Sequence, residues 1–167
     1  MGLSVRDISL NLLRWLFGAV FLFSGLTKAV DPVGTSVFVE KYLTTYGLDA
    51  LMEFALPIAL ALATVELTLG IAVIINAFHR QTLRISLLFV ALFTLITLLS
   101  ATVLPIGDCG CFGDAVKLSP WATFWKNIGL LVVVVVLLRC DQREYTTSLT
   151  QIGLCLVGLL FALGLNL

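Results

Sequence analysis

Long apolar runs separated by short polar segments dominate the chain. A membrane-spanning helix needs about 20 consecutive, mostly apolar residues, because the hydrocarbon core of a bilayer is about 30 Å thick. Five runs approach or exceed that length, with the polar residues gathered between them. The pattern therefore predicts one transmembrane domain over residues 1–167, with helices at about 10–30, 51–78, 83–104, 120–138 and 149–165.

Polar and helix-breaking residues mark where these runs end. Asp31-Pro32 closes the first run, since proline disfavours helical geometry at the residue before it. Segment 35–49 then mixes aromatic with charged side chains, which predicts a short amphipathic helix at the membrane surface. Residues 79–84 are polar and are expected to form a short loop between the second and third spans.

Composition supports a membrane protein over a soluble one. Of the 167 residues, 60% are hydrophobic and 12% are charged, and the mean hydropathy is +1.10. Soluble domains have about 45–50% apolar and about 25% charged residues. The expected fold is therefore an all-α polytopic bundle in a lipid bilayer. Ten basic and ten acidic residues balance, so no net field favours nucleic acid as a partner.

Basic residues predict the orientation, because Lys and Arg near helix ends favour the cytoplasmic side. With the N-terminus inside, six basic residues fall on the inner side and four on the outer side. The C-terminus and segment 106–118 are then expected outside. The inner set is Arg6, Arg14, Arg80, Arg84, Arg139 and Arg143, and the outer set is Lys28, Lys41, Lys117 and Lys126.

Two cysteines in the outer segment are the sharpest chemical signal. Cys109 and Cys111 flank Gly110, which tolerates the backbone angles of a tight turn. A disulfide closing so short a loop is strained, and strained or exposed bridges tend to be the labile ones. Three interpretations stay open: a redox-active pair, a permanent bridge and a metal site. Zinc needs four Cys or His ligands, and His79 is expected on the opposite side, so no metal ligand is assigned.

Two charged residues inside the spans are further candidates, because such residues usually mark function or pairing. Glu66 is expected either to pair with Arg14 or to belong to a proton path or quinone pocket. Lys28 either extends to the interface or lowers the pKa of a nearby thiol. Both lie on faces of small residues suited to close helix packing: Ala59, Ala63 and Gly70 with Glu66, and Gly18 and Gly25 with Lys28.

The other two cysteines are expected to be free thiols inside or at the end of a span. Cys140 is expected at the inner end of the fourth span and Cys155 within the fifth. Buried free cysteines usually behave as small apolar residues. We therefore expect no redox role for either.

Three motifs resemble one family of redox-associated membrane proteins. They are the segments 21–32 (FLFSGLTKAVDP), 66–70 (ELTLG) and 108–113 (DCGCFG), the last followed by a tryptophan and by Lys126-Asn127. Together they are similar to DoxX-like proteins and to the methylamine-utilisation protein MauE over about residues 10–140. The family resemblance implies a four-helix membrane bundle, from which the fifth predicted span departs.

The resemblance also implies a redox role. MauE is linked to maturation of a disulfide-rich periplasmic subunit of methylamine dehydrogenase, and DoxX relatives to quinone-coupled sulfur oxidation. Carried onto this chain, Cys109 and Cys111 become the thiol pair, with Lys28 and Glu66 as candidate cofactor-binding positions and quinone as the candidate cofactor. Some longer relatives add a thioredoxin-like domain, so a thioredoxin-like protein is an expected partner.

Two functional hypotheses follow. The first is a thiol–disulfide oxidoreductase of the bacterial inner membrane. It would pass electrons between periplasmic thiols, or a thioredoxin-like protein, and a quinone or redox complex. The second is a non-catalytic accessory subunit of a larger membrane complex, in which Cys109 and Cys111 form a static bridge.

Overall fold

The computed structural model describes residues 5–103, 118–141 and 148–165, and within these ranges every regular element is helical. The all-α prediction is therefore confirmed. The elements in chain order are α1 (Val5–Val30), α2 (Pro32–Thr45), the 3₁₀ helix η1 (Asp49–Phe54), α3 (Ala55–Ile75), α4 (His79–Thr102), α5 (Pro120–Cys140) and α6 (Leu149–Leu165).

Four helical segments of the described chain are long and apolar enough to cross a membrane. They are α1, the continuous stretch η1–α3, α4 and α5. At a rise of about 1.5 Å per residue, each can traverse the hydrocarbon core. The polytopic membrane architecture predicted from the apolar runs is thus confirmed. The fifth predicted span is present as a helix, α6, which is apolar but shorter, with 17 residues.

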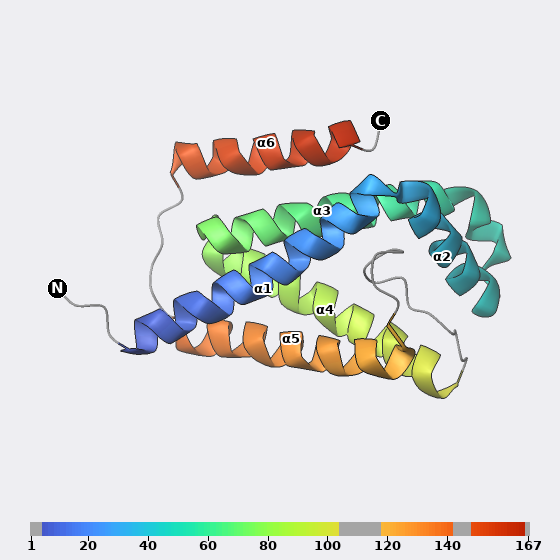
Figure 1. Ribbon diagram of the computed structural model, residues 1–167, viewed down its shortest axis with the longest axis horizontal. Helices are drawn as coiled ribbons and strands as arrows, with labels where there is room; N and C mark the ends of the chain where they lie inside the picture. Colours follow the sequence, from blue (N-terminus) through green and yellow to red (C-terminus); the bar gives the residue numbers. More distant parts are fainter. Residues whose placement is uncertain (1–4, 104–117, 142–147, 166–167) are drawn as a thin grey trace.

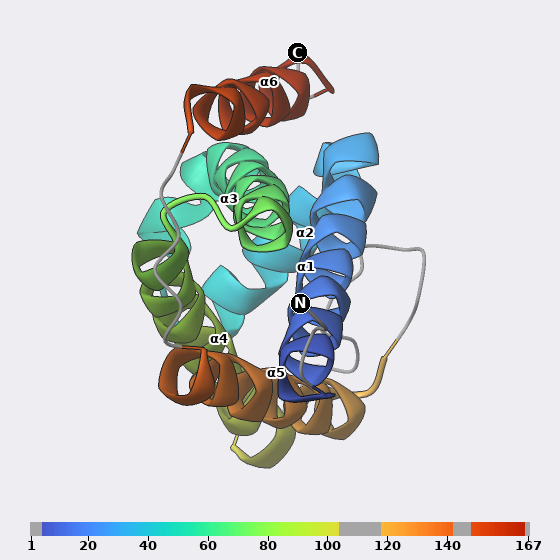
Figure 2. The same cartoon turned by 90° about the vertical axis from the view of Figure 1, so that its left-hand side faces the viewer.

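The helices form two antiparallel pairs. α1 packs most extensively against α3, and α4 packs against α5. α3 and α4 contact each other much less, although they follow directly in the chain. α2 lies across the end of the bundle against α3, and α6 lies on the side of α3 away from α5 (Figures 1 and 2). α2 therefore covers one end of the bundle that the two pairs form.

The α1–α3 contact depends on glycine. A Cβ on Gly25 would lie 2.7 Å from the backbone nitrogen of Leu67, and one on Gly70 would lie 2.9 Å from the backbone nitrogen of Leu22. No side chain fits at these distances, so the two backbones approach as closely as only glycine allows. Ala63, on the same face of α3, is fully buried. The predicted small-residue faces are confirmed as the helix contact.

The junction between α1 and α2 differs from the prediction. α1 ends at Val30, as expected, but α2 begins at once at Pro32 and not near residue 35. The Asp31 carboxylate accepts a hydrogen bond of 2.8 Å from the backbone N–H of Gly34. Asp31 is therefore an N-cap, and Pro32 occupies the first helical turn, where its missing N–H costs nothing.

The prediction of a polar loop at residues 79–84 is wrong, because α4 already begins at His79. The chain reverses direction over Asn76, Ala77 and Phe78, with Asn76 and Phe78 in the left-handed region at φ 58° and 46°. Asparagine tolerates this conformation better than most residues. The turn therefore needs only three residues, and the polar residues that follow it form the first turns of α4.

Candidate functional site

Cys109 and Cys111 lie outside the described residues. Their segment joins the end of α4 at Thr102 to the start of α5 at Pro120. Both of these helix ends lie at the end of the bundle that α2 covers (Figure 1). The described residues at that end are therefore the ones from which a site can be built.

A buried ion pair joins α1 to α3. Lys28 Nζ donates a hydrogen bond to Glu66 Oε2 at 2.8 Å and another to Ser24 Oγ at 2.8 Å. Lys28 is 3% exposed and Glu66 is 5% exposed. Two charges at this depth persist only because they neutralise each other and share further hydrogen bonds. The structure thus brings both predicted cofactor-binding residues into direct contact.

This geometry corrects two expectations. Lys28 does not extend to the interface, because its ammonium group is buried against Glu66. Glu66 pairs with Lys28 and not with Arg14, which lies about 21 Å from Lys28 along α1 at the usual helical rise. The carboxylate also offsets the charge of Lys28. Lys28 is therefore a poor source of the positive field that would activate a thiol.

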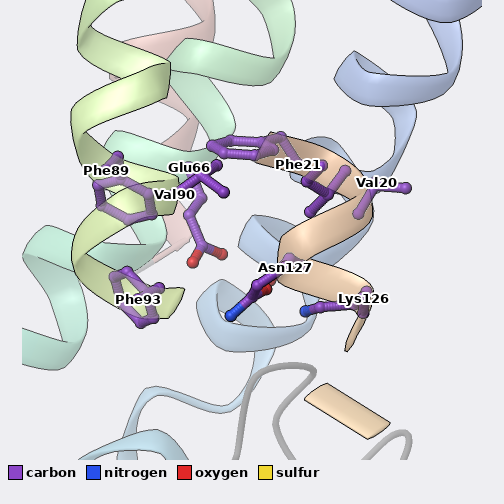
Figure 3. A pocket seen from close by; sticks show the side chains of 10 residues that line it. Val20, Phe21, Glu66, Phe89, Val90, Phe93, Lys126 and Asn127 are labelled. Carbon is purple, nitrogen blue, oxygen red and sulfur yellow. The ribbon is translucent and has the colours of Figure 1, made fainter. Parts of the chain in front are cut away.

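A small cavity with mostly apolar walls and four polar residues lies at Glu66. Its volume is about 30 Å³, enough for a water molecule. The Glu66 carboxylate points into it from α3, and Asn127 and Lys126 approach from α5 (Figure 3). Phe93 of α4 forms part of the wall. The cavity thus joins groups from all four long helices, with Ser24 contributed by α1.

Asn127 connects this cavity to α4. Its side-chain amide lies 3.4 Å from Thr97 Oγ1 and donates to it, and both residues are buried. The carboxylate of Glu66 uses Oε2 for Lys28, and no hydrogen bond to Oε1 is found among the described residues. The site can therefore hold a water molecule or a small polar group against a carboxylate inside an apolar bundle.

Sequence reasoning missed part of this cluster. The sequence motifs include Lys126-Asn127 but assign it no contact, and they assign no role to Thr97 or Ser24. A usable signal was present, since Asn127 is an amide within a span that is otherwise strongly apolar. Buried amides need hydrogen-bond partners, so an inward-facing position was predictable, but its partner on α4 was not.

A second buried polar cluster occupies the opposite end of the bundle. His79 Nδ1 lies 3.1 Å from Asn76 Oδ1, and His79 Nε2 lies 3.8 Å from Asp141 Oδ2. These contacts connect the turn between α3 and α4 to Asp141 at the end of α5. Nearby, Cys140 is an exposed free thiol, while Cys155 on α6 is a partly buried one. Cys140 is the last residue of α5, at the opposite end of that helix from Lys126 and Asn127.

The helical architecture and the charges buried inside it define a polytopic membrane protein. The chain belongs to the family of the methylamine utilisation protein MauE, whose family model matches residues 6–139. This match covers α1 to α5 and leaves α6 outside. The resemblance to MauE inferred from the sequence motifs is therefore confirmed.

One curated relative is Protein TlpB of Flavobacterium psychrophilum. It is 29% identical over an alignment of 133 residues that covers 75% of this chain and 35% of that protein. The chain therefore spans about a third of the length of this relative. No solved structure matches the chain.

The ion pair makes a stability prediction. Lys28→Met and Glu66→Gln should each destabilise the fold by about 3–5 kcal/mol, because each leaves one buried charge without its partner. The double variant should lose much less than the sum of the two. Thermal unfolding in detergent micelles measures all three.

Glu53→Gln is the matched control, since Glu53 is exposed on η1. We expect it to change the free energy of unfolding by less than about 0.5 kcal/mol. Strictly additive losses in the double variant would contradict an energetic coupling between Lys28 and Glu66.

Proposed function

We propose that this chain is a membrane thiol–disulfide redox protein in which Cys109 and Cys111 are the reactive pair. The observation that carries the proposal is the buried Lys28–Glu66 pair with the small cavity at Glu66. It lies in the half of the bundle from which the Cys-Gly-Cys segment leaves α4 and enters α5. Charged groups at this depth in a membrane bundle are costly, and by default they indicate function. Membership of the MauE family supports the same interpretation.

The proposed reaction starts with thiol–disulfide exchange. A thiolate of a thioredoxin-like or client protein attacks one sulfur of the Cys109–Cys111 disulfide and forms a mixed disulfide. The second thiolate of that protein then releases the mixed disulfide. The partner leaves with a disulfide, Cys109 and Cys111 become a dithiol, and two electrons have moved into the membrane protein.

The second half of the proposed reaction oxidises the Cys109–Cys111 dithiol back to the disulfide. The dithiol loses two electrons and two protons, its two S–H bonds break and the S–S bond forms again. A lipid-soluble quinone is the proposed acceptor and becomes a hydroquinone. A carboxylate held in a water-sized cavity inside the bundle is a suitable group to carry a proton between thiol and acceptor. Glu66 is the residue for that role.

Mixed-disulfide trapping tests the thiol chemistry. Of Cys109→Ser and Cys111→Ser, the variant that keeps the sulfur attacked by the partner should accumulate a mixed disulfide with a second protein. Its remaining thiolate can exchange with an oxidised partner, and it has no neighbouring cysteine with which to form a disulfide. The double variant should accumulate none. Non-reducing gels after acid quenching and alkylation show the species, and a reductant should remove it.

The combined Cys140→Ser and Cys155→Ser variant is the control and should trap and react like the original chain. The competing function is an accessory subunit with a static Cys109–Cys111 bridge. It predicts that both single variants lose abundance in the membrane and that neither forms a mixed disulfide.

The proposed location is the bacterial inner membrane, with the N-terminus inside and the Cys-Gly-Cys segment on the periplasmic side. α5 is 21 residues long, about 31 Å at the usual helical rise, and Cys140 is its last residue. A membrane-impermeant maleimide added to intact spheroplasts under reducing conditions should therefore label Cys109 and Cys111. Cys140, an exposed thiol, should react only after the membrane is opened. The reverse pattern would overturn this orientation.

A further inference from the structure

A large apolar cavity lies between α2 and α4. Its volume is about 440 Å³, within the range of about 300–1,000 Å³ typical of small-molecule sites. α3 closes it on one side with Leu62. The other walls are Tyr42 and Tyr46 at the α2 end, and Phe93, Ile96 and Thr97 on α4. It is thus formed where the two helix pairs diverge.

The walls suit a flat apolar ring. The rings of Tyr42 and Tyr46 stack at a centroid distance of 6.2 Å and an angle of 15°, and Phe93 contributes a third aromatic surface. None of the described residues that line the cavity is charged. A phosphate headgroup would find no cation there, and a soluble polar molecule would find too few hydrogen-bond partners.

Tyr46 supplies a hydrogen-bond donor at this wall. Its hydroxyl lies 3.5 Å from the carbonyl oxygen of Ile96 and 3.4 Å from Ser100 Oγ. Bonds between two oxygens are normally about 2.7–2.8 Å long, so both contacts are weak. The hydroxyl can therefore turn to a carbonyl oxygen in the cavity at little cost.

The cavity adjoins the ion-pair site. Phe93 lines both this cavity and the small one into which the Glu66 carboxylate points. Thr97 lines the large cavity and accepts the hydrogen bond from Asn127, which lines the small one. The two cavities are thus neighbours that share Phe93 as a lining residue.

We propose that this cavity binds a membrane quinone, with the Tyr46 hydroxyl donating a hydrogen bond to a ring carbonyl. The ring stacks among Tyr46, Tyr42 and Phe93, and the alkyl tail follows the apolar walls. The choice of a redox-active ring rests on the proposed function, since the dithiol needs an acceptor of two electrons and two protons. The binding itself rests on the cavity alone.

Photolabelling tests the site in the full chain carrying Cys109→Ser and Cys111→Ser, reconstituted in lipid nanodiscs. The probe is an azido-quinone with a short isoprenoid tail, and the labelled peptides are identified by mass spectrometry. We expect saturable labelling of the peptides from α2 and α4. A short-chain quinone should displace the probe, whereas an alcohol with the same tail should not.

Two variants sharpen the test. Tyr46→Phe keeps the ring but removes the donor, and should weaken quinone binding roughly three- to tenfold, the usual contribution of one hydrogen bond. Leu62→Trp fills the cavity and should abolish labelling. Leu95→Trp is the matched control, since Leu95 is 56% exposed on the outside of α4 and does not line the cavity.

Three results would overturn the site: no saturable labelling, equal displacement by the alcohol, or unchanged binding in Tyr46→Phe. Equal displacement would show that the cavity accepts lipid chains without regard to the ring. The thiols are absent from this experiment, so its failure is separate from that of the thiol chemistry. Mixed disulfides formed without quinone binding would leave the proposed function with another acceptor.

Discussion

The ion pair between Lys28 and Glu66 is the interaction around which this membrane bundle is built. Removing two charges from water costs several kcal/mol for each, and only close pairing with additional hydrogen bonds offsets that cost. The 2.8 Å contact requires α1 and α3 to approach closely in one register. Gly25 and Gly70 permit that approach, because any side chain there would collide with the backbone of the opposing helix. The packing of small residues and the pairing of charges are thus one constraint.

The same constraint arranges the end of the bundle where chemistry is proposed. With α1 and α3 held together, the Glu66 carboxylate faces α5, where Asn127 reaches Thr97 of α4. The weak contact between α3 and α4 leaves room for the apolar cavity beneath α2. One half of the molecule therefore holds the small cavity at Glu66, the larger apolar cavity, and the ends of α4 and α5 that the Cys-Gly-Cys segment joins. This clustering connects the family assignment to a concrete redox hypothesis.

Much of the architecture was predictable because hydropathy reports helix length directly. The four long spans and the small-residue faces followed from that pattern. The partner of Glu66 did not, because Arg14 and Lys28 lie on the same face of α1 and only the register between helices selects one. The Asp31-Pro32 motif predicts the end of one helix correctly, but its capping of the next helix depends on the chain turning immediately. The apolar cavity depends on how α2 packs, which no periodicity encodes.

The most direct test of the redox account is the midpoint potential of the Cys109–Cys111 pair. Purified protein equilibrated in defined thiol buffers, with the thiols read by alkylation shift, provides it. The account predicts a potential above roughly −270 mV, in the range of disulfides that exchange electrons. A bridge that stays oxidised below roughly −300 mV would be a structural one. That result would contradict a role in passing electrons.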